Sequence, residues 1–438
     1  MSQSQPAEFA RWVVERLSQA GHQALWAGGC VRDMLLGKSP KDYDVATSAT
    51  PEKVREIFGT RRTIPVGVAF GVITVVGDKT AGNVEVATFR CDGGYSDGRH
   101  PDHVTFSNAE QDAQRRDFTI NGLFYDPVRA QVIDYVGGQS DLQGGLVRAI
   151  GNPVDRFHED HLRMLRAIRF ATVLDFQIEA VTIAAIQDLA PRIVTVSGER
   201  VAAEMHRVLN SCHRGRGLEL LDQSGLLRHL LPDFDLSRPL ARHTFGKTCQ
   251  RLHQLPVTSH GLEITLSILA LDQLLVSQRV GSLIPWEQVL VNFSRQMEQV
   301  VRAWKLSNES KSVFRAVTTH LAAVVQASRL PWSRLQPTLI APNIAAVLAV
   351  AEGIAGSGFM AMEDVTLCRH HLTRPIIELN PPPLLTGDEL RAGGMPQGPL
   401  LGQWLAELRR LQLDAVVTSK AAAWDWVHAR AKTTSGKE

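Results

Sequence analysis

The stretch "LWAGGCVRDMLLGKSPKDYDVATSATP", residues 25–51, places two alternating carboxylates after a glycine pair. Asp42 and Asp44 are one residue apart in a segment that reads as a strand, where alternate side chains point to the same face. Two carboxylates so close repel each other unless a cation lies between them. Mg²⁺ suits this position because it prefers oxygen ligands and completes its shell with water and substrate phosphates. The stretch therefore predicts a magnesium site.

The glycine pair that precedes these carboxylates suits an anion. Gly28 and Gly29 form a turn before a helix that we expect to start near Val31, so backbone N–H groups can approach a phosphate. Arg32 adds a charged donor. A solvated Asp-x-Asp loop is a common alternative for the carboxylate pair alone, but the Gly-Gly-x-x-Arg-Asp pattern upstream makes it a minor one. Triphosphate plus metal is the simplest interpretation.

A third carboxylate is expected from a neighbouring strand. Glu85 is the polar position in the otherwise apolar alternation of "NVEVATFR", residues 83–90. A two-metal phosphoryl transfer uses such a group to share the ion that activates the attacking hydroxyl. The pattern alone favours equally an outward-facing glutamate on a hairpin.

Length and composition set broad limits. A chain of 438 residues is long enough for roughly two to four domains. The net charge of +2 decides nothing about nucleic acid, because a basic groove can be balanced by acids elsewhere. Five scattered cysteines without a Cys-x-x-Cys pair predict neither a zinc site nor a disulfide framework. With no signal core and no long apolar run, we expect a cytoplasmic protein without a membrane segment.

The pattern of predicted secondary structure changes near residue 150. Before it, helical patterns at 6–21 and 49–59 alternate with strand patterns at 23–29, 70–77 and 83–90, the last two forming an antiparallel hairpin. After it, strand patterns disappear and helical periodicity continues. We expect an α+β protein, in which a mixed-sheet head is followed by an all-α remainder. The expected domains are 1–150, 151–212, 213–375 and 376–438, with a boundary near the proline run 381–383.

Five motifs occur in order through residues 25–175: "GGCVRD", "KDYDVAT", "VEVATFR", "RRDFTIN" and "RFHEDHLRMLRAIRF". Together they resemble the class II tRNA nucleotidyltransferase and bacterial poly(A) polymerase family, which contains the CCA-adding enzymes of the polymerase-β nucleotidyltransferase superfamily. The segment 381–415 resembles the tail of that family, while the similarity over about 215–375 is weak. The resemblance implies a nucleotidyltransferase head, then a helical neck, body and tail.

The activity that this resemblance implies is template-independent addition of CCA, or of its terminal A, to the 3′ end of tRNA. ATP and CTP would be the nucleotides and pyrophosphate the leaving product. Asp42 and Asp44 would bind the catalytic metals, and Gly29 and Arg32 would hold the incoming triphosphate.

The motif "RRDFTINGLFYD", residues 115–126, would contact the nucleotide. Arg116 resembles a nucleotide-contacting arginine of the family. Asp117 and Asn121 lie four apart on an expected helix and could face one sugar. A surface helix of mixed charge is the alternative for this motif taken alone.

The motif at 156–170 is expected to select the base. On a helix, Asp160, Arg163, Arg166 and Arg169 step by three, beside an apolar stripe that begins at Leu162. A carboxylate accepts from an exocyclic amino group and a guanidinium donates to the adjacent ring nitrogen, so the first two match C or A. In the resembled family this pair is a protein template, and the other two arginines would contact phosphate or support it. The alternative is an ordinary helix with ion pairs.

Two other segments complete the expectations. The polar, glycine-rich segment 91–112 resembles the flexible loop that helps the family switch from C to A. Some relatives carry a phosphohydrolase domain with an adjacent His-Asp pair; here His243 and Asp272 stand apart, so we expect no second metal centre. The helical body would follow the tRNA backbone by shape and charge.

The motifs leave alternatives open. Poly(A) polymerase is the close rival, because it shares these motifs, although the chain lacks a long basic extension. A small-molecule nucleotidyltransferase shares the metal carboxylates but needs neither an Asp-Arg template nor a large helical body. A non-catalytic RNA-binding module needs no strand Asp-x-Asp. The oligomeric state is left open.

Overall fold

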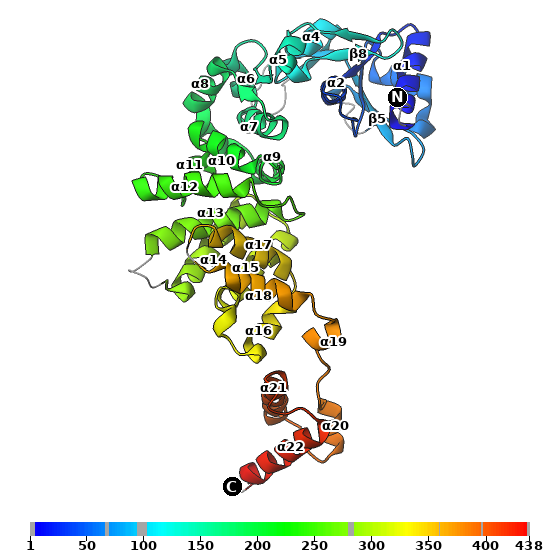
Figure 1. Cartoon of the computed structure of the whole chain (residues 1–438). Coiled ribbons are helices and arrows are strands. Elements are labelled where there is room, and N and C mark those ends of the chain that lie inside the picture. Colours follow the sequence, from blue (N-terminus) through cyan, green and yellow to red (C-terminus); the bar gives the residue numbers. More distant parts are fainter. Residues whose placement is uncertain are drawn as a thin grey trace. The chain divides into compact units, whose positions relative to one another are not determined.

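The computed structural model describes residues 5–65, 70–93, 103–278, 284–358, 360–395 and 397–435. The chain divides into two compact units, Met1–Pro232 and Asp233–Glu438. A mixed sheet with helices lies in the first unit, and helices make up the remainder (Figure 1). The predicted α+β class is therefore confirmed.

The described residues of the first unit form a seven-stranded sheet in the order β3-β4-β5-β2-β1-β8-β9. Within it β2 and β5 run parallel, and the other neighbours are antiparallel. The predicted hairpin is confirmed as β4 and β5. The strands are β1 (Ala24–Ala27), β2 (Asp44–Thr47), β3 (Thr63–Ile64), β4 (Val72–Val76), β5 (Asn83–Thr88), β8 (Phe124–Asp126) and β9 (Gln131–Ile133).

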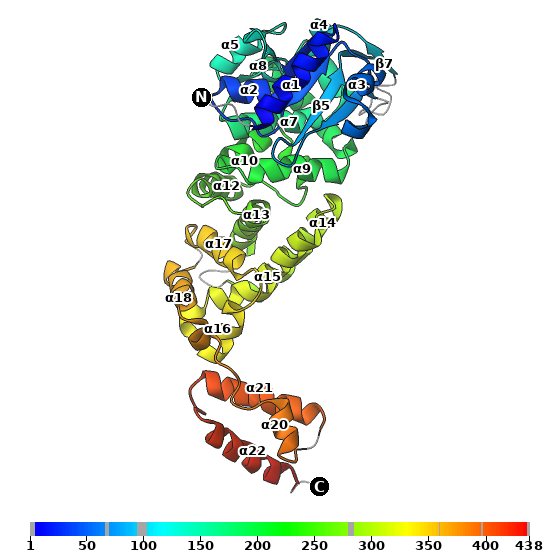
Figure 2. The ribbon, with the colours of Figure 1, turned by 90° about the vertical axis from the view of Figure 1, so that its right-hand side faces the viewer.

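Two helices cover one face of this sheet. Helix α1 (Gln5–Gln19) packs on β1, β2 and β5, and α3 (Pro51–Phe58) packs on β4 and β5 (Figure 2). The sequence signals that bound α3 act as expected. Thr50 accepts a hydrogen bond from the backbone N of Lys53 at 3.4 Å, and Gly59 ends the helix. A short turn, η1 (Thr60–Arg62), follows.

The other face of the sheet carries the site. A buried cluster joins this face to helix α4 (Ala109–Gln114): Leu25, Ala27, Ala46, Phe89, Ala109, Ala113 and Phe124. Because side chains alternate along a strand, Asp44 lies on the same face as Ala46. The hairpin β6 (Arg90–Gly93) and β7 (His103–Phe106) precedes α4. Residues 94–102 of the expected flexible loop lie outside the described residues.

Several small elements follow α4, and helices come after them. The small elements are η3 (Thr119–Asn121), α5 (Gly138–Gln143) and β10 (Leu146–Val147), which pairs in parallel with the later strand β11 (Gln177–Ile178). The two-residue β11 corrects the prediction that strands disappear after residue 150. The helical elements that follow in the first unit are α6 (Pro153–Glu159), α7 (Leu162–Leu174), α8 (Ala180–Leu189), η4 (Ala190–Thr195), α9 (Gly198–Leu209), α10 (Arg214–Gln223) and α11 (Leu227–Leu230).

Helix α7 lies among these helices and packs against α9 and α10. Leu162, Leu165 and Ile168 of the predicted apolar stripe are buried. The expected continuous helix from Asp160 onward is wrong, however. Asp160 has φ −152° and ψ 105°, an extended conformation that separates α6 from α7. Its carboxylate instead accepts from the backbone N of Leu162 at 3.0 Å.

The second unit is helical throughout its described residues. Its elements are α12 (Pro239–Leu252), α13 (Gly261–Gln278), α14 (Trp286–Ala303), α15 (Asn308–Val324), η5 (Ala327–Arg329), α16 (Trp332–Leu339), α17 (Ile344–Ala355), α18 (Met362–Leu372), α19 (Ile376–Leu379), α20 (Gly387–Ala392), α21 (Pro399–Leu413) and α22 (Lys420–Ser435). Helix α13 is buried along most of its length. In this unit Asp272 pairs with Arg251 and accepts from Ser357 at 2.6 Å.

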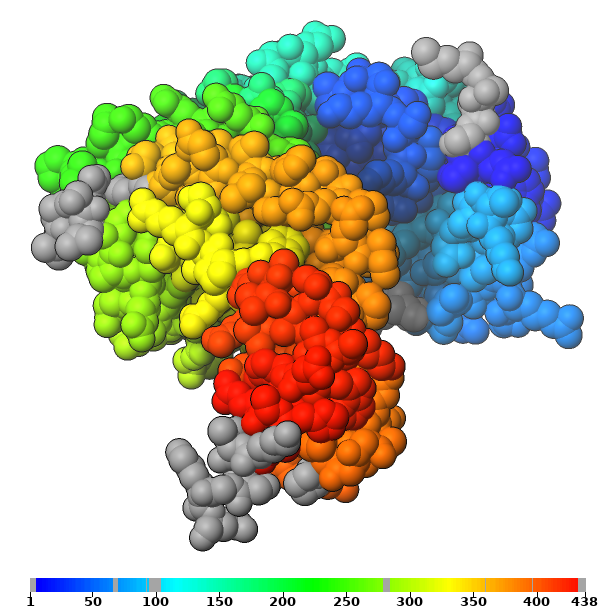
Figure 3. Space-filling view, turned by 60° about the horizontal axis from the view of Figure 1, so that its bottom comes forward, coloured from blue at the N-terminus to red at the C-terminus, as the bar shows by residue number. Residues whose placement is uncertain are grey.

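The last helices share a core of their own. Leu390, Trp404 and Val427 belong to one buried cluster, and α21 and α22, coloured red, lie together in Figure 3. The division into four domains stays a prediction. Among the described residues, no single helix is long and apolar enough to cross a membrane, and a bent pair, α16 with α17, meets that test only jointly.

Candidate active site

The two acidic strands meet at the centre of the sheet. Asp44, the first residue of β2, lies opposite Glu85 of β5 in the parallel register. Asp42 lies in a bend before β2, so the prediction that both aspartates belong to the strand is wrong. No strand in the described part of the chain pairs with Asp42. The pairing of β1 with β2 reaches only to Val45, because β1 is followed by Gly28 and helix α2 (Gly29–Leu35).

The surroundings of Asp44 disfavour its ionised form. Its side chain reaches solvent, but the surrounding chain excludes enough water to raise its pKa to about 6, and repulsion from Glu85 and Asp42 adds to this effect. The charge of Arg116 opposes the shift without cancelling it. A bound cation would stabilise the ionised form, so the residues present fit a metal. Within the described ranges, no group of three His, Cys, Asp or Glu side chains is arranged to hold a metal by itself. Two carboxylates such as Asp42 and Asp44 leave most positions around an ion to water and a nucleotide, as Mg²⁺ prefers.

The glycine turn leaves no space for a side chain. Gly28 has φ 73° and ψ −124°, a conformation that is strained for other residues, and it caps the start of α2. A Cβ atom at this position would lie 2.9 Å from Nη1 of Arg116. The backbone N of Gly28 donates to the carbonyl of Leu123 at 3.0 Å, which fixes the turn against the sheet.

A hydrogen-bonded chain links three elements beside this turn. Arg32 of α2 donates to Oδ1 of Asn121 at 2.6 Å, and Nδ2 of Asn121 donates to Oδ1 of Asp117 at 3.1 Å. Oδ2 of Asp117 accepts from Nε of Arg166 on α7 at 2.8 Å. The structure thus brings together four of the predicted nucleotide-binding residues.

The expected helix through Asp117 and Asn121 is wrong. Asp117 precedes the 3-10 turn η3, and Phe118 between them is extended with φ −131°. The carboxylate of Asp117 accepts from the backbone N of Phe118 at 2.8 Å, a local bond that competes with helix formation. The two side chains still meet, but through a tight turn.

Asp117 is ionised at every ordinary pH. Burial by itself would raise its pKa, but the charge of Arg166 and the hydrogen bonds from Asn121 and Arg166 outweigh burial and lower the pKa to about 2. The pair of the buried Asp117 and the half-buried Arg166 joins the segment before η3 to α7.

Arg116 is held on the other side of the turn. It pairs with the buried Asp112 of α4, with Nη2 and Oδ2 3.0 Å apart, and donates to the carbonyl of Asn121 at 3.3 Å. Its guanidinium lies 5.0 Å from the ring centre of Phe124. Asp112 also pairs with Arg115 at 2.7 Å, so one buried carboxylate orients both arginines of the motif.

Three arginine side chains surround the ring of Phe170. The guanidinium carbons of Arg32, Arg166 and Arg169 lie 5.2, 5.5 and 3.9 Å from its ring centre. Arg169 is buried and pairs with Glu204 of α9 at 2.8 Å. Burial lowers the pKa of Arg169 to about 10, which leaves it charged at neutral pH. Each of these arginines is paired with an acid, Arg32 with Asp33, Arg166 with Asp117 and Arg169 with Glu204, so the cluster places guanidinium donors beside the glycine turn without a net positive charge.

The two expected template residues have protein partners. Oδ2 of Asp160 lies 2.7 Å from Nη2 of Arg200 on α9. Arg163 pairs with Glu159, and its guanidinium also donates to the carbonyls of Arg156 at 3.0 Å and Arg115 at 3.5 Å. The last bond places Arg163 beside the motif that begins at Arg115.

Four supporting residues escaped the sequence reasoning: Asp112, Phe170, Arg200 and Glu204. A signal existed for two of them. Arg200 and Glu204 are four apart on the strongly amphipathic segment "GERVAAEMHRVL", so they share a helical face. Phe170 ends the motif at 156–170 and Asp112 ends the segment 91–112, but their partners become visible only in three dimensions.

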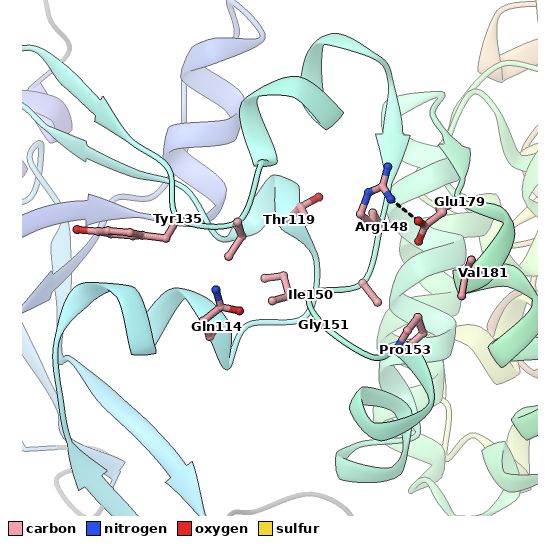
Figure 4. A pocket seen from close by; sticks show the side chains of 11 residues that line it. Gln114, Thr119, Tyr135, Arg148, Ile150, Gly151, Pro153, Glu179 and Val181 are labelled. Carbon is pink, nitrogen blue, oxygen red and sulfur yellow. Dashed lines mark hydrogen bonds and ion pairs between the residues drawn. The ribbon is translucent and has the colours of Figure 1, made fainter.

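A separate cavity of about 400 Å³ lies near the end of the head (Figure 4). Gln114, Thr119 and Tyr135 line one side, and Arg148 and Glu179 line the other. Arg148 pairs with Glu179 and, at 3.0 Å, with Asp141 of α5. Its charge is already neutralised, and none of the predicted site residues lines this cavity.

Comparison with protein families finds two matching models. Residues 24–148 match the "Poly A polymerase head domain". Residues 175–237 match the "Probable RNA and SrmB- binding site of polymerase A".

Individual proteins match most of the chain. The CCA-adding enzyme of Lactiplantibacillus plantarum is 32% identical over 92% of this chain and 91% of its own length. That of Limosilactobacillus reuteri is 30% identical over 95% of each chain. The crystal structure of the Bacillus stearothermophilus CCA-adding enzyme in complex with CTP superimposes with a TM-score of 0.72, at 27% identity, and covers 99% of both chains.

Proposed function

Because the chain belongs to the family of CCA-adding enzymes, we propose that the cluster around Asp44 and the glycine turn is its nucleotidyltransferase site, which adds CCA to tRNA 3′ ends. Asp42 and Asp44 would hold the divalent metal that enzymes of this kind generally use, and we propose Mg²⁺ because both ligands are carboxylates. Bound there, the metal would supply charge that activates the RNA 3′-hydroxyl and stabilises the α-phosphate. Glu85 would face the same ion or tune Asp44 by repulsion.

One of the arginines around Phe170 would contact the triphosphate. Arg32 lies one turn into α2, shortly after Gly28 and Gly29. Arg32 pairs with Asp33, Arg166 pairs with Asp117, and Arg169 is buried against Glu204. We assign phosphate contact to Arg32 because it lies at the start of α2, and structural support to Arg169 because it is buried.

Sugar and base would lie beyond the phosphates. Asn121 and Asp117 face one another where the sugar would bind. Arg116 would keep the phosphate side cationic. Asp160 and Arg163 would read the Watson–Crick edge of C or A, with Arg200 and Glu159 holding them in position.

The observation that carries this proposal is the register of Asp44 against Glu85, with the raised pKa of Asp44. The test uses three tRNA transcripts, ending before CCA, after C and after CC, with CTP and ATP supplied separately. We expect CTP to extend the first two transcripts and ATP to extend the third by one residue. No incorporation into any of them would refute the proposal.

The same assay decides between two related activities. Long adenosine tails on all three transcripts would indicate a poly(A) polymerase, the activity that the matching head model names. Incorporation of A alone, only after CC, would indicate an A-adding enzyme. A cytoplasmic location stays a prediction from the sequence.

A further inference from the structure

A cavity of about 320 Å³ lies in the second unit between α14 and α15, which pack side by side (Figure 2). Met297 of α14 and Phe314 of α15 are buried and line it, together with the half-buried Val301. Ser294 and Thr318 add hydroxyl groups to the wall. Its size is at the lower end of that of pockets that hold small ligands.

Three cations line this cavity against one acid. Arg302, Lys311 and Arg315 are exposed, and Glu298 lies 3.9 Å from Arg302. Lys311 donates to Oδ1 of Asn308 at 3.3 Å, a neutral partner. Among the described residues no acid pairs with Lys311 or Arg315. The cavity therefore combines an apolar lining with two positive charges that no acid neutralises.

This combination matches one nucleotide of an RNA chain. A base offers apolar faces and polar edges, and its flanking phosphates need cations. A paired helix would need the cations but not the apolar lining, since its bases are stacked inside. A protein helix or strand would need a far larger contact area than the wall of a cavity of about 320 Å³ offers.

We propose that this cavity binds an unpaired nucleotide of the tRNA substrate, with the base against Phe314 and Met297 and the phosphates at Lys311 and Arg315. The inference rests on the proposed tRNA function. The cavity lies in the second unit, whereas all nucleotide motifs lie in the first. Its role is therefore RNA affinity, not the choice between CTP and ATP.

The phosphate part is tested by the double variant Lys311→Ala/Arg315→Ala in the full-length protein. Binding of a tRNA transcript without CCA is measured over a series of salt concentrations. We expect the Kd to rise about tenfold at ~0.1 M salt, and the slope of log Kd against log salt to fall by about one to two. The matched control is Arg295→Ala, an exposed arginine on α14 that does not line the cavity.

The base part is tested by filling the cavity. Thr318→Trp should weaken tRNA binding without changing the salt slope, because the cations stay in place. Thr319→Trp is the control, since Thr319 is exposed beside Thr318 and does not line the cavity. Ser294→Met fills the cavity from the other helix and repeats the test if the first variant unfolds. A blunt RNA duplex without unpaired nucleotides should bind wild type and Thr318→Trp equally.

The outcomes separate the two proposals. If the wild-type protein extends tRNA but the cavity variants bind tRNA as their controls do, the cavity inference is wrong and the catalytic proposal stands. If Lys311→Ala/Arg315→Ala loses binding of polyglutamate and not of tRNA, the cavity serves an acidic protein partner and the inference is also wrong. If the wild-type protein extends no tRNA, the catalytic proposal fails.

Discussion

Nη2 of Arg200 on α9 lies 2.7 Å from Oδ2 of Asp160, the residue at which the chain breaks between α6 and α7. Removing the carboxylate should abolish discrimination before it abolishes chemistry. We expect Asp160→Ala to admit UTP or GTP, and discrimination to relax by about one to two powers of ten, because one bidentate base contact contributes about 1–3 kcal/mol. The ratio of kcat/KM for CTP and UTP measures the effect.

Arg200→Ala provides the graded comparison. Asp160 keeps its bond from the backbone N of Leu162 in this variant, so the loss of discrimination should be smaller than for Asp160→Ala. A folded Asp160→Ala protein that keeps wild-type nucleotide ratios would show that the break between the helices is structural. Specificity would then come from the RNA end or the flexible loop.

Asp44→Asn should remove activity and stabilise the metal-free protein at neutral pH. A raised carboxyl pKa means that the folded state binds the proton more tightly than the unfolded state. The ionised group is therefore destabilising above its folded pKa of about 6, and this effect vanishes below roughly pH 4. We expect a higher Tm for Asp44→Asn at pH 7.5 in chelator, and no difference at pH 4.

Adding Mg²⁺ supplies the control for this prediction. The wild-type Tm should rise with Mg²⁺ concentration, and the Tm of Asp44→Asn should respond much less. Nucleotide addition should fall by about three powers of ten or more, while tRNA affinity stays within about twofold. Near-normal activity of the variant would remove Asp44 from the metal site.

Gly28→Ala should damage the site although it adds a single methyl group. The positive φ of 73° is costly for alanine, about 1–3 kcal/mol, and the new Cβ would approach Arg116 to 2.9 Å. We expect weaker CTP and ATP binding, measured by calorimetry, and lower stability to urea. Gly37→Ala also has a positive φ but open space around it, so it controls for backbone strain alone.

Asp117→Ala should destabilise the first unit by about 1.5–3 kcal/mol, because it removes the buried carboxylate that accepts from Arg166, whose own side chain is one-third exposed and stays hydrated. The depressed pKa gives the sign of the pH dependence. Ionised Asp117 stabilises the folded state above its unfolded pKa of roughly 4, and this stabilisation is lost as the pH falls towards about 2.

A double-mutant cycle with Arg166→Leu isolates the interaction. Urea unfolding of both single variants and the double variant should give a double variant that loses less stability than the two singles summed. Simple additivity would show that the two side chains act independently.

Removing residues 381–438 should weaken tRNA binding more than nucleotide binding. The cut keeps α19, because Gln336 donates to the carbonyl of Leu379 at 3.0 Å, and it removes the separate cluster around Leu390 and Trp404. The cut also breaks the bonds of Ser333 to Asp414, so Tm is measured alongside. Unchanged tRNA affinity would refute a tRNA-binding role for the tail.

Periodicity predicted the hairpin of β4 and β5 and the bounds of α1 and α3, because local signals such as Thr50 and Gly59 act within their own turn. It did not predict β3, β8 or β9. It failed where a distant partner decides the backbone. Asp160 leaves the helix although its neighbours have helical spacing, and its carboxylate then meets Arg200, forty residues away.

The site residues show the same division. The strand patterns placed Asp44 and Glu85 on two strands, but left open whether Glu85 faces outward; the parallel register of β2 and β5 brings the two residues opposite each other. The grouping of Arg32, Arg166 and Arg169 around Phe170 could not, because it depends on how α7 docks against α2 and η3. Pattern reasoning finds residues on one element; packing decides which elements share a site.

The parallel pairing of β2 with β5 makes the position of the catalytic carboxylates depend on the register of the sheet. Side chains alternate along β5, so a slip of one residue would turn Glu85 towards α1 and α3 and bring Val84 or Val86 opposite Asp44. The same error would bury a charge, expose a valine and dismantle the catalytic carboxylates. A misregistered molecule would therefore lose its catalytic carboxylates and its stability together.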